Sequence, residues 1–152
     1  MREKLIDSFG RVHKDLRISV TDRCNFRCTY CMPAEGLDWV PRDELLTFEE
    51  IERVARLSVE QFGIESIRIT GGEPTVRARL PVLIKKLAQL PVDLSMTTNG
   101  ATLRVLSQDL VSAGLKRINI SLDSLQSERF TELTLRDNLP QVLDGIEAAV
   151  ES

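Results

Sequence analysis

Residues 16–33 read LRISVTDRCNFRCTYCMP and contain all three cysteines of the chain, Cys24, Cys28 and Cys31. The first residues alternate between apolar and polar side chains, which predicts a β-strand. The cysteines follow in one short loop with the spacing Cys-x-x-x-Cys-x-x-Cys. Three thiolates can hold three irons of a cubic iron–sulfur cluster and leave the fourth iron without a protein ligand. An iron of that kind can bind a substrate or cofactor, so the spacing indicates chemistry rather than simple electron transfer.

A structural zinc ion is the alternative interpretation of the cysteine loop. Its fourth ligand would have to come from elsewhere in the chain, and His13 is the only histidine. Disulfides are not expected, since the number of cysteines is odd and the charged N-terminus is unlike a signal peptide. The spacing favours the cluster over zinc, and the zinc site stays open as an alternative.

The composition is that of an ordinary globular domain. The chain has 152 residues, of which 42% are apolar and 28% are charged, with a net charge of −3. The net charge shows no excess of positive residues that would indicate nucleic-acid binding. No apolar run is long enough to span a membrane. Free cysteines suit a reducing compartment, so we expect a cytoplasmic protein.

Strand-like runs alternate with helical runs along the sequence. Helices are expected over 47–63, 80–90 and 103–114, and a fourth after Asn138. Thr47 and Glu50 form a capping-box pattern for the first of these helices. Short connections between strands and helices predict parallel βα units with right-handed crossovers. The strands are expected over 16–21, 65–70, 93–98 and 117–122.

All four strands alternate apolar and polar residues, whereas buried parallel strands are usually apolar throughout. The apolar faces must meet the helices, so the polar faces are expected to line a wet, concave surface. Arg17 and Arg68 fall on that surface, where unpaired buried charges would be costly, and an anion with phosphates or a carboxylate would pair with both. The alternative is a half-open sheet with one solvated face.

Ligands of parallel α/β folds bind at the carboxyl ends of the strands. The cysteine loop lies at such an end. The turn Gly71-Gly72-Glu73-Pro74 and the segment Thr97-Thr98-Asn99-Gly100 follow the next two strands. Glycines let a backbone approach a ligand closely. We expect Glu73 to organise its turn and contact a cofactor rather than act as a general base.

These residues together resemble the radical S-adenosylmethionine (SAM) superfamily. Its signatures are the cysteine spacing with an aromatic residue, Tyr30, before the third cysteine, and the turn at residues 71–74. More closely, the chain is similar to the N-terminal part of the molybdenum-cofactor GTP 3′,8-cyclases, over nearly its whole length from about Gly10. The resemblance implies an α/β fold, a partial parallel (βα) barrel with about four of six βα units. Residues 1–152 would be a truncated radical SAM core domain, with residues 1–14 as an N-terminal extension and without the C-terminal part that holds a second cluster.

The resemblance also implies a chemistry. The three thiolates would hold a [4Fe-4S] cluster, whose fourth iron SAM would ligate, and reductive cleavage would give a 5′-deoxyadenosyl radical. In these cyclases the radical takes a hydrogen from C3′ of GTP, and the product is 3′,8-cyclo-7,8-dihydro-GTP. No catalytic side chain is expected beyond the cluster ligands. Arg17, Arg68 and Thr97 match positions that contact GTP, and three other residues match positions that contact SAM: Tyr30, Gly72 and Ser121.

An electron donor such as flavodoxin or ferredoxin is expected as a partner, together with a possible homodimer and neither nucleic acid nor a membrane. Two other functions stay open. One is a radical SAM enzyme that acts on another substrate, such as a peptide. The other is a non-catalytic metal-binding module, to which the missing C-terminal half of the family gives some weight.

Overall fold

Four short strands form one parallel sheet, in the order in which they occur along the chain. The structure is a computed structural model and describes residues 3–152. Because each strand pairs with the next, every βα unit stands beside its sequence neighbour, as predicted. The strands are β1 (Asp15–Ser19), β2 (Ser66–Thr70), β3 (Asp93–Thr98) and β4 (Arg117–Ile120).

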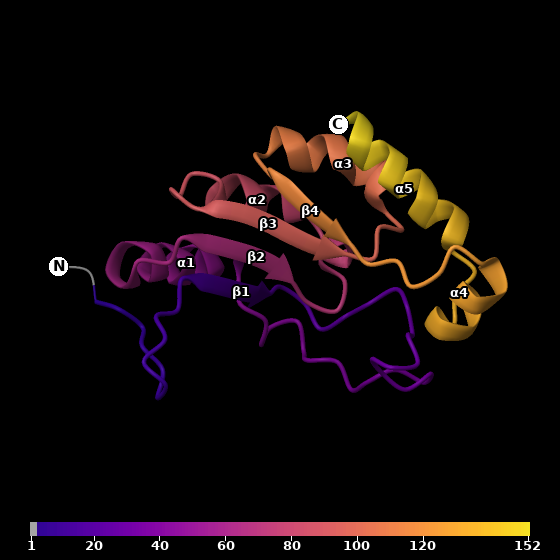
Figure 1. Cartoon of the computed structure of the whole chain (residues 1–152), viewed down its shortest axis with the longest axis horizontal. Coiled ribbons are helices and arrows are strands. Elements are labelled where there is room, and N and C mark those ends of the chain that lie inside the picture. Colours follow the sequence, from indigo (N-terminus) through magenta and orange to yellow (C-terminus); the bar gives the residue numbers. More distant parts are fainter. Residues whose placement is uncertain (1–2) are drawn as a thin grey trace.

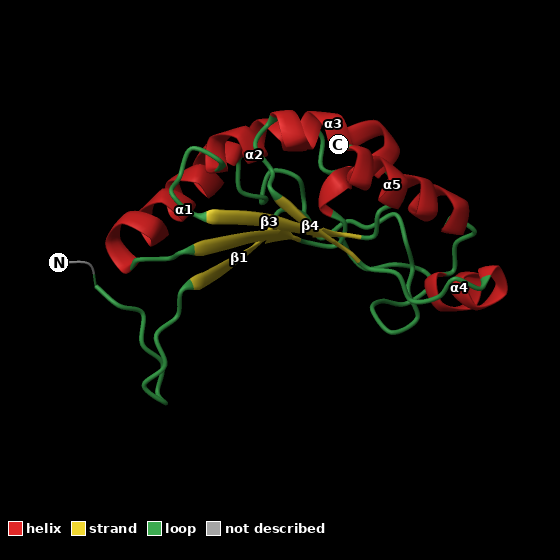
Figure 2. Ribbon diagram, turned by 45° about the horizontal axis from the view of Figure 1, so that its top comes forward, coloured by secondary structure: helices red, strands yellow, loops and turns green. Residues whose placement is uncertain are grey.

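The helices lie in an arc over one face of the sheet, and the opposite face is open (Figure 2). The layer consists of α1 (Phe48–Phe62), α2 (Leu80–Leu87), α3 (Leu103–Ser112) and α5 (Leu139–Glu151). A short 3-10 helix, η1 (Pro74–Val76), follows β2. The arrangement is a partial barrel of four βα units, which confirms the predicted fold class.

The core lies between the sheet and this helical layer. The central strands bury their apolar side chains almost completely, and Ile67, Ile69, Leu94 and Met96 are each at most 2% exposed. Burial of each such side chain stabilises the fold by roughly 1.5–3 kcal/mol. The alternation in the sequence therefore predicted correctly which face of each strand meets the helices.

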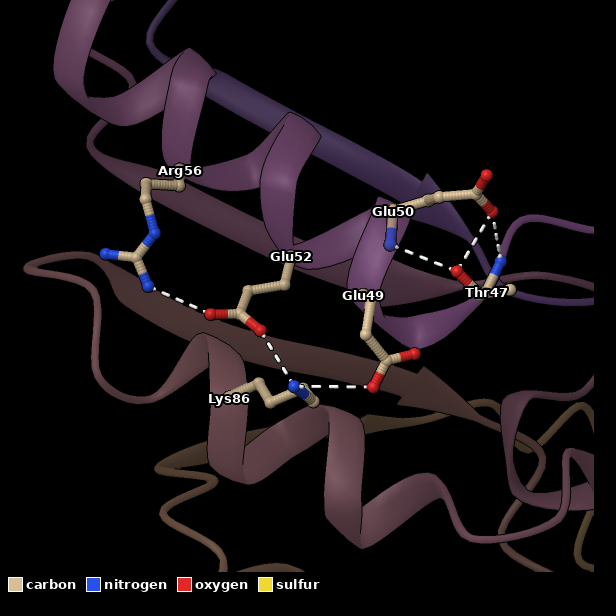
Figure 3. Close-up of polar contacts among 6 residues, drawn as sticks. All are labelled: Thr47, Glu49, Glu50, Glu52, Arg56 and Lys86. Carbon is tan, nitrogen blue, oxygen red and sulfur yellow. Dashed lines mark hydrogen bonds and ion pairs between the residues drawn. The ribbon is translucent and has the colours of Figure 1, made fainter.

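The first helix begins and ends where the sequence predicted. The Thr47 hydroxyl accepts the Glu50 backbone N–H at 3.2 Å, and the Glu50 carboxylate accepts the Thr47 N–H at 2.7 Å (Figure 3). These two bonds form the capping box. Gly63 ends the helix in the left-handed region, with φ of 70°.

Ion pairs join α1 to α2 on the outer surface of the layer. Lys86 on α2 lies 2.9 Å from a carboxylate oxygen of Glu52 and 3.4 Å from one of Glu49 (Figure 3). Glu52 also accepts a hydrogen bond from Arg56 at 2.9 Å. Partly exposed pairs of this kind contribute roughly 0–1 kcal/mol each to stability.

One helix was not predicted. α4 (Ser127–Thr134) follows β4 and lies apart from the helical layer, near the carboxyl ends of the strands (Figure 1). It has no side-chain hydrogen bond at its N-cap, and only Phe130 and Thr134 of its residues are buried. A helix this short with one large buried side chain has almost no apolar periodicity, which is why the sequence did not reveal it.

The N-terminal segment projects from the sheet beside β1 (Figures 1 and 2). An isolated antiparallel bridge joins Ile6 to Val12. Of the expected extension over 1–14, residues 1 and 2 lie outside the described residues, and its boundary stays a prediction. Among residues 3–152, no helix has both the length and the apolar character needed to cross a membrane.

Candidate functional site

The glycine turn after β2 is hydrogen-bonded to the start of the cysteine loop after β1. The Gly72 N–H donates to the Thr21 carbonyl at 2.7 Å, and the Glu73 N–H donates to the Arg23 carbonyl at 2.8 Å. A Cβ on Gly72 would lie 2.4 Å from the carbonyl oxygens of Asp22 and Arg23. Position 72 must therefore be glycine, because the turn lies directly against the loop that carries the cysteines.

Glu73 ties this turn to the end of β3. The residue is 1% exposed. One oxygen accepts from the Thr75 N–H at 3.0 Å and from the hydroxyls of Thr75 and Thr98 at 2.6 Å each, and the other accepts the Asn99 N–H at 2.7 Å. The expectation that Glu73 organises its turn is confirmed, and its hydrogen bonds extend to the neighbouring strand as well.

The helix that the sequence missed supports the cysteine loop. The rings of Phe26 and Phe130 meet edge to face, and these two residues form a small core with Leu139 and Val142, against which Cys24 packs. Two N–H groups of the loop donate to the last carbonyls of α4, from Arg27 to Thr134 at 3.0 Å and from Thr29 to Leu133 at 2.9 Å. The predicted site therefore depends on α4, a helix that was not predicted from the sequence.

Tyr30 links the cysteine loop to the segment after β4. Its hydroxyl donates to the Asp123 carboxylate at 2.7 Å, and this contact raises the pKa of Tyr30, since loss of the proton would leave two anions together. Asp123 lies two positions after Ser121, whose N–H donates to the Thr98 carbonyl at 2.9 Å. Tyr30 and the Ser121 segment, both predicted to contact SAM, are thus joined through Asp123.

Arg17 and Arg68 are register partners on β1 and β2, and they alternate with residues that pack into the core, so they lie on the open face of the sheet. Both side chains are exposed. The expectation of buried charges was wrong, because four strands leave the face open to solvent. Within the described part of the chain neither arginine has a carboxylate within 4.0 Å. Thr97 lies on the same face of β3, nearer its carboxyl end.

A third arginine, Arg117 on β4, lies in register with Arg17 and Arg68 and was not predicted. Ser95 on β3 is the register partner both of Arg68 and of Arg117 on β4. Arg117 donates from Nε to an Asp93 carboxylate oxygen at 3.1 Å, so its charge is already paired. The alternating sequence of β4 contained this signal, since Arg117 shares the parity of Asn119 and Ser121.

The thiols are free and lie in a partly buried loop. Burial raises the pKa of the Cys24 and Cys28 thiols, although the Phe26 N–H donates to Cys24 Sγ at 3.4 Å and acts in the opposite direction. In the region from residue 3 to the C-terminus, no three side chains of Cys, His, Asp or Glu are gathered as ligands of one metal ion.

Residues 18–152 match the model of the Radical SAM superfamily. The chain belongs to the radical SAM superfamily. It is 54% identical over 150 residues to the GTP 3′,8-cyclase of Rhodopirellula baltica, covering 97% of this chain and 42% of that protein. It is 50% identical over 147 residues to the GTP 3′,8-cyclase of Mycolicibacterium smegmatis, covering 95% and 41%. The chain thus spans less than half the length of these curated relatives.

The fold assignment has independent support from a solved structure. Streptococcus suis SuiB bound to the precursor peptide SuiA superposes with a TM-score of 0.71 at 22% identity. The match covers 91% of this chain and 30% of the SuiB chain. At that identity the likeness concerns the fold alone.

Membership of the radical SAM superfamily implies a [4Fe-4S] cluster and SAM as cofactors. The donor set fits a cluster with one open iron, because three free thiols lie on one loop. The cluster ligands Cys24, Cys28 and Cys31 stay a prediction, as do the individual contacts. The structure brings the Gly72 turn onto the cysteine loop, and it holds Arg17, Arg68 and Thr97 farther along the open face.

Proposed function

We propose that this chain is the N-terminal part of a radical SAM GTP 3′,8-cyclase, which converts GTP to 3′,8-cyclo-7,8-dihydro-GTP in molybdenum-cofactor biosynthesis. Residues 1–152 would be its truncated core domain, with residues 1–14 as an N-terminal extension. The support comes from the superfamily assignment and from relatives of that name at about half identity over almost the whole chain. Because the chain spans only about 42% of such a relative, the activity belongs to the complete protein.

The observation that carries the choice of substrate is the pairing of Arg17 with Arg68. Like charges directly opposite each other on neighbouring strands repel, and no carboxylate among residues 3–152 neutralises them. Guanidinium groups bind phosphate oxygens through two parallel hydrogen bonds. A triphosphate on the open face would therefore relieve the repulsion and fix the orientation of a nucleotide.

The remaining parts of the site have separate tasks in this proposal. Cys24, Cys28 and Cys31 hold the cluster, which when bound supplies the electron that cleaves SAM. Tyr30, Gly72 and Ser121 contact SAM at the carboxyl ends of the strands, and Thr97 contacts GTP. A flavodoxin or ferredoxin as electron donor, a homodimeric assembly and a cytoplasmic location also belong to the proposal.

Anaerobic reconstitution of the 152-residue chain tests the cofactor part. The chain is loaded with ferrous iron and sulfide, its iron content is measured, and 5′-deoxyadenosine is quantified after addition of SAM and dithionite. We expect a brown protein that forms 5′-deoxyadenosine. A loaded cluster without that product contradicts the proposal, and one equivalent of zinc without iron would favour a non-catalytic module.

GTP binding by equilibrium dialysis tests the substrate. Arg17→Ala and Arg68→Ala should each weaken binding by about 10–100-fold, since a charged hydrogen bond contributes about 1.5–3 kcal/mol. Arg117→Ala is the matched control, because its guanidinium is already paired with Asp93. Equal affinity in all four proteins would favour another substrate, such as a peptide.

A further inference from the structure

Two arginines, one within the cysteine loop and one after α4, bind the backbone of this loop. Arg27 Nη1 donates to the carbonyls of Cys24 and Phe26, each at 2.7 Å, and Arg136 Nε donates to the carbonyl of Asn25 at 3.0 Å. Three consecutive carbonyls between the first two cysteines are therefore all hydrogen-bonded to guanidinium groups. In each case the donor is a guanidinium group rather than a backbone N–H.

Both guanidinium groups are held in place by further contacts. Arg27 lies over the ring of Trp39, with its central carbon 5.4 Å from the ring centroid. Arg136 lies between α4 and α5, and its Nη1 donates to the Leu135 carbonyl at 2.7 Å. Each side chain is partly buried. The two positive charges are thus fixed beside the loop rather than free to move in solvent.

The arginines also fix the direction of the peptide groups. The Asn25 carbonyl, held by Arg136, belongs to the same peptide group as the Phe26 N–H, which donates to Cys24 Sγ at 3.4 Å. Arg27 holds the carbonyls of the two neighbouring peptide groups. Hydrogen bonds to ligand sulfurs and the net charge around a cluster are two of the factors that set its reduction potential.

Two carboxylates beside the loop carry charge of the opposite sign. Glu73 lies in the turn whose N–H groups are bonded to the loop, and the Asp123 carboxylate accepts from the Tyr30 hydroxyl. Negative charges at these positions disfavour a more negative cluster, so the two arginines offset them.

We propose that Arg27 and Arg136 are positioning residues that raise the reduction potential of the cluster held by this loop. The inference rests on the proposed function, because it assumes that the cysteines hold a cluster. In the step concerned, the oxidised cluster takes up one electron from a low-potential one-electron donor, and its total charge becomes more negative by one. No bond is broken and no proton is needed. Fixed cations and sulfur-directed N–H groups stabilise the reduced form more than the oxidised form.

Redox titration of the reconstituted chain tests the inference. Dithionite is titrated in the presence of viologen mediators, and the reduced cluster is quantified by electron paramagnetic resonance. We expect Arg27→Gln and Arg136→Gln to shift the midpoint to more negative potential. The corresponding Lys variants keep the charge but lose the guanidinium geometry, so they should shift it in the same direction by less.

Arg53→Gln is the matched control, since Arg53 is exposed on α1 and makes no hydrogen bond or ion pair with the described residues. Its midpoint should equal that of the unsubstituted chain. A purely structural role would lower the iron content and leave the midpoint of the remaining clusters unchanged, and that result overturns the inference. If the Gln variants bind no iron, an unshifted midpoint in the Lys variants overturns it. An unsubstituted chain that assembles no cluster overturns the proposed function itself, and the inference with it.

Discussion

The ring of Phe26, between the first two cysteines, meets the ring of Phe130 on α4 edge to face, with centroids 5.8 Å apart. The two side chains are 4% and 1% exposed. Aromatic pairs in this geometry contribute about 0.5–1.5 kcal/mol beyond the burial of their area. The cysteine loop therefore packs against a helix that begins about a hundred residues later in the chain.

Removal of the Phe130 ring should destabilise the chain and loosen the loop. We expect Phe130→Ala to lower the free energy of unfolding by about 3–5 kcal/mol, as for other buried aromatic residues. Urea unfolding measures this, and iron uptake during reconstitution should fall as well. Val105→Ala is the control, because Val105 is 81% exposed on α3 and its truncation should cost less than about 0.5 kcal/mol. Equal stability of the two variants would show that α4 does not support the loop.

Glu73 should be intolerant even of its amide. In Glu73→Gln one acceptor oxygen is replaced by a donor that faces the Thr98 hydroxyl or the Asn99 N–H. A buried donor without an acceptor costs about 1–3 kcal/mol, so the free energy of unfolding should fall by that amount. Glu65→Gln is the matched control, since Glu65 has only an exposed ion pair with Lys14, worth about 0–1 kcal/mol. Thermal unfolding of the two variants distinguishes them, and a loss for Glu73→Gln no greater than for Glu65→Gln would contradict the role given to this carboxylate.

A methyl group at Gly72 should separate the glycine turn from the cysteine loop. The added Cβ meets backbone oxygens of Asp22 and Arg23 at 2.4 Å, and neither can move without displacing the loop. We expect Gly72→Ala to cost about 1–3 kcal/mol of stability, as for other overpacked sites, and to lower the iron bound per chain. Gly10→Ala is the comparison, because nothing lies within 4 Å of a Cβ there; its φ of 79° gives that variant a backbone strain of about 1–2 kcal/mol, but far from the cysteine loop, so its iron content should not change. Unchanged iron content in Gly72→Ala would mean that the close approach is not needed for the site.

The parts of this fold with a local sequence signal could be predicted. Period-two alternation gave the faces of all four strands, and register then placed Arg17 beside Arg68. Contacts between distant segments had no such signal. Arg136 donates to Asn25, which lies 111 positions earlier in the chain. It can do so because it follows the end of α4, a helix without a clear sequence signal. Side-chain networks of this kind depend on tertiary packing, which alternation and spacing do not encode.

The same limit applied to the open face of the sheet. The sequence indicated which residues lie on it, but whether they are buried depends on how far the barrel closes. With four strands the face is solvated, so Arg17 and Arg68 are exposed and Arg117 pairs with Asp93. The free arginines could therefore be predicted as a pair, whereas the pairing of the third arginine required the structure.

The cap of α1 should make stability depend on pH through Glu50. Its carboxylate accepts the N–H and the hydroxyl of Thr47, and these bonds lower the pKa of Glu50 below its usual 4.5. A carboxyl group with a lower pKa in the folded state stabilises the fold above its ordinary pKa, and this contribution is lost as the pH falls through the lowered value. Glu50→Gln should therefore be less stable than the unsubstituted chain near neutral pH, and the difference should shrink steadily below about pH 4.5. Urea midpoints of both proteins between pH 3 and 7 measure this difference.

Glu132→Gln serves as the control, since Glu132 is exposed on α4 and makes no hydrogen bond or ion pair within residues 3–152. A difference for Glu50→Gln that stays constant over the whole range would show that the amide caps the helix as well as the carboxylate does, and that the charge of Glu50 contributes nothing.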